Sequence, residues 1–195
     1  LTPRETGDNK NALLLSGVMV NALCTALILF FVTMTQDARL HNILYWLMGD
    51  LSVALPGQIF VLGLLVFPCF LIIFLLARPL NLLYLGEEQA GYLGLNVAGV
   101  TYLLLGVTSF MLSAAVCQSG LVGFVGLVVP HLLRLWLGPE HRILVPACVL
   151  GGGAYLVWCD LLARVLPSQG ELPVGVVTAL IGAPLFILLL QRSRL

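Results

Sequence analysis

The sequence predicts an all-α membrane protein, a polytopic helical bundle with about six transmembrane crossings, one of them a short broken helix. Of its 195 residues, 60% are hydrophobic and only 9% are charged, whereas soluble domains carry about 25% charged residues. The mean hydropathy is +1.07. Nine basic and nine acidic residues give zero net charge, so nothing indicates a nucleic-acid partner.

Five stretches have about the 20 apolar helical residues that a bilayer crossing requires. They are residues 12–34, 59–77, 97–116, 143–166 and 174–190. The first contains the polar residues Asn21 and Thr25, four positions apart. Polar groups inside a membrane face a cavity or bind another helix, and both readings remain open for this pair. The fourth stretch carries Asp160 and Arg164 on one helix face, where they can form an ion pair.

Residues 120–142, GLVGFVGLVVPHLLRLWLGPEHR, form the least ordinary stretch of the chain. Hydrocarbon offers no hydrogen-bond partner to backbone N–H and C=O groups, so an unsatisfied group is costly in the membrane. This glycine-rich, proline-interrupted segment therefore predicts a broken short span that is surrounded by protein or reached by water. A helix over residues 124–137 would reach about 21 Å, short of the roughly 30 Å hydrocarbon core. The residues that mark this broken span are Gly120, Gly123, Gly126, Pro130, His131 and Arg134.

The basic residues indicate whether the segment 124–137 crosses the membrane. If it does not cross, the nine basic residues divide four against five. If it crosses, one side collects Arg4, Lys10, Arg78, Arg134, Arg142, Arg192 and Arg194. Cytoplasmic loops are enriched in Lys and Arg, so the seven-to-two division favours six crossings with a cytoplasmic C-terminus. Residues 35–58 then form an extracytoplasmic loop with a short amphipathic helix.

Residues 78–96, RPLNLLYLGEEQAGYLGLN, are cytoplasmic in this topology. Their pattern predicts two short helices that are broken around Gly86. Glu87 and Glu88 fall in the first turn of the second helix, where the helix dipole favours acidic groups. Such an elbow would project toward a cytoplasmic partner, and an ordinary solvated connector is the alternative.

Three segments carry a family resemblance: GFVGLVVPHLLRLWLGPEHRILVP, CDLLAR and ELPVGVVTALIGAPLFILLL. They resemble the C-terminal signature of FecCD-type permeases, the membrane subunits of ABC importers for iron-siderophores, haem and vitamin B12. LLLSGVMVNAL and ILYWLMGDLS are similar to the middle region of the same family. The resemblance implies a single permease domain over residues 1–195 that matches the last six of the family's ten helices and is incomplete at its N-terminus.

The resemblance also implies roles for individual residues. EEQAGYLG is similar to the family's coupling motif, in an elbow that sits in a cleft of the ATP-binding subunit. The residues implied for this coupling are Glu87, Glu88, Ala90 and Gly94. Arg164, in CDLLAR, matches the arginine at which the substrate-binding protein docks. The helices over 12–34 and 174–190 resemble those that line the translocation pathway across a homodimer axis, which suits Asn21 and Thr25.

The function that the resemblance implies is a permease subunit of a binding-protein-dependent ABC importer in the bacterial cytoplasmic (inner) membrane. Its cargo is a metal chelate, with ferric siderophore expected first and haem or cobalamin as alternatives. The implied partners are an ATP-binding subunit, a periplasmic or lipoprotein substrate-binding protein, a second permease copy and the lipid bilayer. A separate subunit would hydrolyse ATP, because the sequence has no glycine-rich loop ending in Gly-Lys-Ser/Thr.

Two other classes of protein compete with this reading. An ion-coupled secondary transporter would need intramembrane carboxylates or broken helices for its coupling ions. Asp160 is the only candidate carboxylate, and Arg164 neutralises it. A membrane-embedded enzyme would need a catalytic set, and the sequence presents none. Because His131 and His141 lack the i, i+4 spacing of a helical zinc site, we expect no metal site and no cofactor.

Overall fold

The computed structural model describes residues 5–35, 37–52, 55–167 and 172–192. Within these residues every regular element is a helix. Four helical stretches of the described residues are long and apolar enough to cross a membrane: Leu15–Thr33, Pro56–Leu75, Val97–Ser119 and His141–Val165. The predicted all-α membrane class is therefore confirmed. The chain divides into two units, residues 1–44 and 45–195.

The first unit consists of helix α1 (Glu5–Thr33) and most of helix α2 (Asp37–Leu47). All side chains of α1 between residues 15 and 31 are exposed. A helix that is apolar on all its sides needs surroundings other than water, as in a membrane span. The predicted span over 12–34 falls on α1, which begins earlier, at Glu5, and ends at Thr33. The short helix predicted within residues 35–58 is α2.

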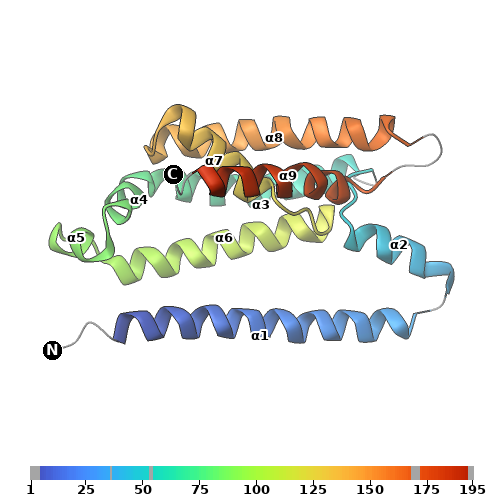
Figure 1. Ribbon diagram of the computed structural model, residues 1–195, viewed down its shortest axis with the longest axis horizontal. Coiled ribbons are helices and arrows are strands. Elements are labelled where there is room, and N and C mark those ends of the chain that lie inside the picture. The colour runs from blue at the N-terminus through green and yellow to red at the C-terminus, as the bar shows by residue number, and fades with distance from the viewer. Residues whose placement is uncertain (1–4, 36, 53–54, 168–171, 193–195) are drawn as a thin grey trace. The chain divides into compact units, whose positions relative to one another are not determined.

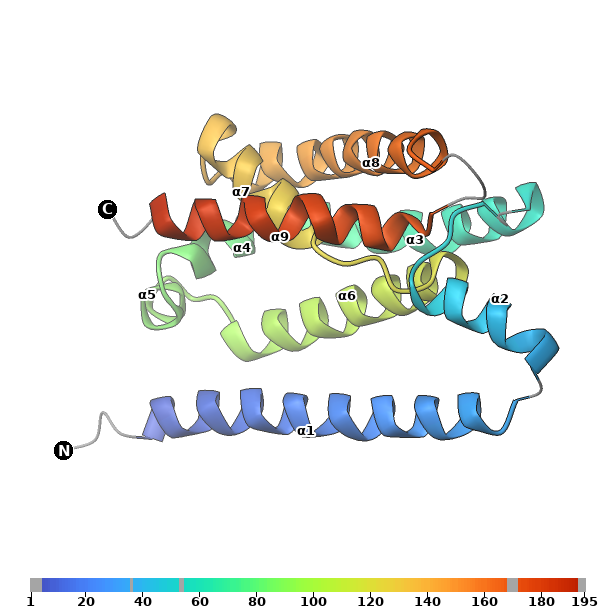
Figure 2. The same ribbon diagram turned by 45° about the vertical axis from the view of Figure 1, so that its right-hand side comes forward.

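The second unit is a bundle of seven helices among the described residues. They are α3 (Pro56–Leu75), α4 (Ala77–Tyr84), α5 (Glu87–Tyr92), α6 (Val97–Ser119), α7 (Val125–Leu137), α8 (His141–Val165) and α9 (Val174–Arg192). Helix α8 is central, because it contacts α3, α4, α7 and α9. Figures 1 and 2 show α4 and α5 together at one end of this bundle, beyond the ends of α3 and α6.

The core of the bundle lies between α8 and α9. Its buried residues are Cys159, Ala163, Val174 and Val177. Small side chains of this kind let two helices approach closely inside a membrane. The fully buried Thr178 hydroxyl donates a hydrogen bond to the Gly175 carbonyl (3.0 Å), and the Tyr155 hydroxyl donates one to the Thr178 carbonyl (3.3 Å). These bonds satisfy the polar groups that the contact buries.

Helix α7 returns the chain to the end of the bundle that carries α4 and α5. Its 13 residues rise about 20 Å, and the extended residues 120–124 supply the rest of the path from the end of α6 (Figures 1 and 2). At the end of the bundle that carries α4 and α5, the His141 backbone N–H donates to the Asn81 side-chain oxygen (2.9 Å). At the opposite end of the bundle, where α6 ends, the Asp50 N–H donates to the Ser119 carbonyl (3.0 Å). This is the route that the six-crossing prediction requires.

The predicted element boundaries differ from the structure by a few residues. The fourth span was expected over 143–166 and begins earlier, at His141. The fifth predicted span, over 174–190, corresponds to α9, a helix of 19 residues. Its described apolar stretch, Val174–Leu189, is shorter than the four stretches that are long enough to cross a membrane. The break at Gly86 is confirmed, because this glycine separates α4 from α5 with φ 123°, a conformation that favours glycine.

Candidate functional site

The extended segment 120–124 crosses the bundle and packs against the backbone of the turn after α2 and of the start of α9. Gly120 has φ 67°, and a Cβ atom there would fall on the Trp46 carbonyl oxygen. A Cβ atom on Gly175, at the start of α9, would fall on the Met48 carbonyl oxygen. Only glycine permits approaches this close. The segment is therefore held where α6, α9 and the turn after α2 meet.

Phe124 ends this segment in a left-handed conformation, with φ 66°, and precedes the first residue of α7. Its carbonyl oxygen accepts hydrogen bonds from the N–H groups of Leu127 (3.1 Å) and Val128 (2.9 Å), which starts the helix. A Cβ atom on Gly182 of α9 would fall on the Phe124 Cβ atom. A bulky residue with positive φ costs about 1–3 kcal/mol and persists only where its surroundings fix it. Contact with Gly182 provides this constraint.

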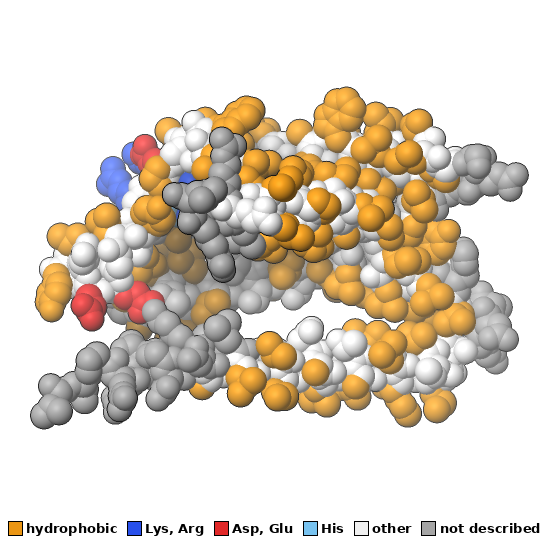
Figure 3. All heavy atoms as spheres, viewed as in Figure 1, with side chains coloured by type: hydrophobic (Ala, Val, Ile, Leu, Met, Phe, Trp, Pro, Cys, Tyr) orange, Lys and Arg blue, Asp and Glu red, His pale blue; other side chains and the backbone are white. Residues whose placement is uncertain are grey.

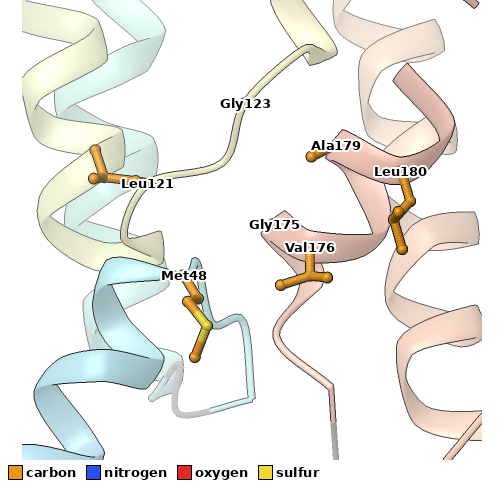
Figure 4. Close-up of a pocket in the computed structure, with 7 residues that line it drawn as sticks. All are labelled: Met48, Leu121, Gly123, Gly175, Val176, Ala179 and Leu180. Atoms are coloured by element: carbon orange, nitrogen blue, oxygen red, sulfur yellow. The ribbon is translucent and has the colours of Figure 1, made fainter. Parts of the chain in front are cut away.

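An open cavity of about 550 Å³ borders the extended segment. Its lining residues are Met48, Leu121, Gly123, Gly175, Val176, Ala179 and Leu180. Figure 4 shows Met48 and Leu121 on one side of the cavity and the α9 residues on the other. All the lining side chains are apolar or absent, so the cavity offers loose apolar contact and no charged ligand to a bound molecule.

The other predicted residues of the broken span lie on α7. Gly126 faces open space, since no heavy atom lies within 4 Å of a Cβ atom built there. Pro130 and His131 are half-buried. The Arg134 guanidinium carbon lies 5.3 Å from the centre of the Tyr84 ring, which is a cation–π contact with α4. The structure therefore does not gather these residues into one site, because they follow α7 from one end to the other.

Other parts of the described chain cover only one face of α7. Val128 and Val129 are buried, while Leu135 and Trp136 are 62% and 87% exposed. The expectation that protein surrounds the broken span therefore holds for the face toward α8 and α9.

The four predicted coupling residues differ in exposure on the elbow formed by α4 and α5. Glu87 and Glu88 are exposed in the first turn of α5, as expected. Ala90 is fully buried and can only support the elbow from inside. Gly94 is exposed with φ 84°, and no heavy atom lies within 4 Å of a Cβ atom built there. Its conformation, rather than the space around it within this chain, requires glycine.

The most exposed large hydrophobic side chain on the elbow is Tyr92, at 90%. Two other residues of the elbow, Leu93 and Leu85, are also exposed, at 63% and 56%. Figure 3 shows that the charged side chains on the visible face gather at the end of the bundle with α4 and α5. An apolar tip beside acidic groups is typical of a protein-binding surface.

Arg164 and Asp160 form an ion pair on α8, with 2.9 Å between Nε and Oδ2. The two side chains are 45% and 30% exposed. The predicted i, i+4 pair is therefore present, at the end of α8 opposite the elbow. A half-exposed pair of this kind contributes about 0–1 kcal/mol to stability.

Asn21 and Thr25 lie on α1, within the first unit. The Thr25 hydroxyl donates to the Asn21 carbonyl of its own helix (2.8 Å). Both residues are exposed in this chain. The hydroxyl thus has its partner within the helix, so it does not depend on a second helix for its hydrogen bond.

The sequence pattern did not single out several residues that shape these regions. Gly175 and Gly182 make close contacts across the fold that no local spacing reveals. Asn81 could have been noticed in the sequence, since it is the one amide side chain in the leucine-rich stretch LNLLYL. Within the described residues, no three His, Cys, Asp or Glu side chains lie together as a metal ion would require.

The fold and these regions define a multi-spanning membrane protein with a broken span, an apolar cavity beside it and a protruding elbow. The chain belongs to the FecCD transport family, which its residues 1–192 match. A solved structure described as an inward-facing conformation of a metal-chelate type ABC transporter superposes with a TM-score of 0.85. It is 33% identical in sequence, and the match covers 91% of this chain and 58% of that one.

The names of two similar curated proteins state what each protein transports. The hemin transport system permease protein HmuU of Yersinia pestis is 42% identical over 186 residues, covering 95% of this chain and 56% of HmuU. The vitamin B12 import system permease protein BtuC of Klebsiella pneumoniae is 42% identical over 182 residues, covering 93% of this chain and 55% of BtuC. The chain thus spans about half the length of the curated relatives that it matches.

Proposed function

We propose that this chain is part of the permease subunit of an ABC importer that moves a metal chelate across the cytoplasmic membrane. Membership of the FecCD transport family is the observation that carries the proposal. The elbow supports it, because a permease driven by a separate ATPase needs a protruding cytoplasmic surface that the ATPase can move. A binding protein would deliver the chelate, and a second permease copy would complete the pathway.

The named cargoes of the relatives favour a metal held in a large macrocycle. Hemin and vitamin B12 are both of this kind, and the two relatives are equally similar to this chain. We therefore place haem or cobalamin before the ferric siderophore expected first from the sequence. The apolar lining of the cavity beside residues 120–124 suits such a cargo, because loose apolar contacts let a large macrocycle pass without trapping it.

The proposed orientation of the chain is supported by its charges and by the elbow. Arg78, Arg134 and Arg142 belong to the end of the bundle that carries α4 and α5, and all three are exposed. This end is cytoplasmic in the proposal, which also makes the C-terminus cytoplasmic. Arg164 then faces the binding protein on the opposite side. Asn21 and Thr25 on α1 would line the pathway at the dimer axis.

Tyr92 offers the clearest test of the elbow. Because it is 90% exposed, Tyr92→Ala removes little packing within the permease. Loss of a buried aromatic anchor at a protein interface typically costs about 2 kcal/mol or more, or roughly 30-fold in affinity. We expect Tyr92→Ala to weaken ATPase binding by that factor and to lower ATP-dependent uptake, as measured by titration of the purified permease with its ATPase and by vesicle uptake.

The matched control is Tyr102→Ala, which removes another tyrosine that is 75% exposed, on α6 outside the elbow. It should leave ATPase affinity unchanged. If both variants bind the ATPase like the parent, the elbow is a connector and its coupling role is wrong.

A further inference from the structure

A cluster of four side chains ties the elbow to the turn between α7 and α8. Its members are Asn81 and Tyr84 of α4, Arg134 of α7 and His141 of α8. The Asn81 side-chain oxygen lies 2.9 Å from the His141 backbone nitrogen and 2.6 Å from Nδ1 of its ring. It accepts the backbone N–H, and also the ring N–H in the tautomer protonated at Nδ1.

Asn81 acts as the N-terminal cap of α8, although it lies 60 positions earlier in the chain. The first backbone N–H groups of a helix have no partner within it, and a side chain just before the helix usually accepts from them. Glu140 occupies that place but makes no capping hydrogen bond through its side chain. The start of α8 is therefore capped from the elbow.

Tyr84 adds the contacts with α7. The Arg134 guanidinium carbon lies 5.3 Å from the centre of its ring, and the His141 ring meets it edge to face at 6.4 Å and 63°. Arg134 belongs to the last turn of α7, and His141 is the first residue of α8. One turn of α4 thus holds the two helices that meet at residues 138–140.

The opposite end of α7 leads to the extended segment. There Phe124, in its left-handed conformation, contacts Gly182 of α9 beside the apolar cavity. A displacement of the elbow that carries α7 along would therefore change the wall of the cavity. Contiguous packed or hydrogen-bonded elements of this kind can carry energetic coupling between distant sites.

We infer that Asn81 is a positioning residue that fixes the elbow to α7 and α8, so that the three move as one body when the ATPase closes. The inference rests on the proposed function, because it assumes that an ATPase moves the elbow. In this inference the connection between the elbow and the helices α7 and α8 is made by the Asn81 cap, with support from Tyr84. The loop residues that join α4 to α5 do not make it.

The test uses the full permease with its ATPase and binding protein in lipid vesicles, with uptake and ATP hydrolysis measured together. Asn81→Leu keeps the volume of the side chain and removes the acceptor. We expect uptake per ATP to fall roughly tenfold or more, within the 5- to 150-fold range typical of coupling between sites. ATPase binding and basal hydrolysis should stay within about twofold of the parent, because the elbow surface is intact. Asn81→Asp keeps the acceptor and should restore coupling.

The matched control is Asn96→Leu. Asn96 caps α6 within its own helix, where its side-chain oxygen accepts the Gly99 N–H (3.0 Å). The control loses the same kind of hydrogen bond beside the same elbow without separating two elements. Uptake per ATP should not change.

A disulfide supplies a second readout that does not depend on the stability of Asn81→Leu. In a permease without its native cysteines, Asn81→Cys combined with His141→Cys removes the cap and lets an oxidant replace it with a covalent link. Oxidation should raise uptake per ATP, and a reductant should lower it again. A fall on oxidation would show that α4 and α8 separate during the cycle and would overturn the inference.

The outcomes separate this inference from the proposed function. If Tyr92→Ala weakens ATPase binding while Asn81→Leu leaves uptake per ATP unchanged, the elbow is coupled by another route and the Asn81 assignment is wrong. If Tyr92→Ala leaves ATPase binding unchanged, the coupling role of the elbow itself fails, and the Asn81 assignment that rests on it fails as well.

Discussion

Gly120→Ala is expected to prevent most of the permease from accumulating in folded form. The added Cβ atom would fall on the Trp46 carbonyl oxygen, in a backbone with φ 67°. Left-handed strain costs about 1–3 kcal/mol, and overpacking adds about 1–3 kcal/mol, so we expect stability to fall by about 2–6 kcal/mol. The measurement is the amount of intact permease in the membrane, together with its thermal unfolding temperature after purification.

Gly123→Ala is the control for this prediction. Gly123 belongs to the same extended segment, but a Cβ atom there meets no heavy atom within 4 Å. Its abundance and unfolding temperature should match those of the parent. Equal abundance and unfolding temperature for Gly120→Ala and the parent would show that the extended segment does not cross the bundle against the turn after α2.

Arg164→Glu is expected to weaken docking of the binding protein while leaving the permease folded. The ion pair with Asp160 is half-exposed, so its loss costs about 0–1 kcal/mol of stability. Losing one partner of a buried interfacial charge pair costs about 2–5 kcal/mol, or roughly 30-fold to several-thousand-fold in affinity. Binding-protein affinity and uptake should fall by that factor, with subunit assembly and basal ATP hydrolysis near those of the parent.

A charge swap distinguishes docking from a purely internal role for Arg164. A reciprocal Glu→Arg change on the binding protein should restore part of the affinity. The docking role would be withdrawn if Arg164→Asp were rescued by Asp160→Arg within this chain and the docking affinity never changed.

Local sequence patterns predicted the elements that depend on residues close together in the chain. Long apolar stretches identify α1, α3, α6 and α8, because burying an unpaired backbone group in hydrocarbon is costly and a helix pairs its own groups. Gly86, followed by two acidic residues, marked the break in the elbow. The spacing of Asp160 and Arg164 indicated their ion pair, since residues four apart share a helix face.

Contacts between distant segments were beyond such patterns. Nothing near Gly175 in the sequence reveals that it packs against the Met48 carbonyl, and nothing near His141 reveals its cap from Asn81. Ala90 and Tyr92 are two positions apart in one short helix, yet one is fully buried and the other is 90% exposed. The resemblance that selected Ala90 as a coupling residue could not show which side of the elbow it faces.

ATP-dependent uptake by the reconstituted importer tests the central claim most directly. The full permease that carries this sequence would be placed in lipid vesicles with its ATPase, with its binding protein outside and ATP inside. We expect haem or cobalamin to accumulate in the vesicles only when ATP, the ATPase and the binding protein are all present. Accumulation without ATP or the ATPase, driven by a proton or sodium gradient, would contradict the account and identify a secondary transporter.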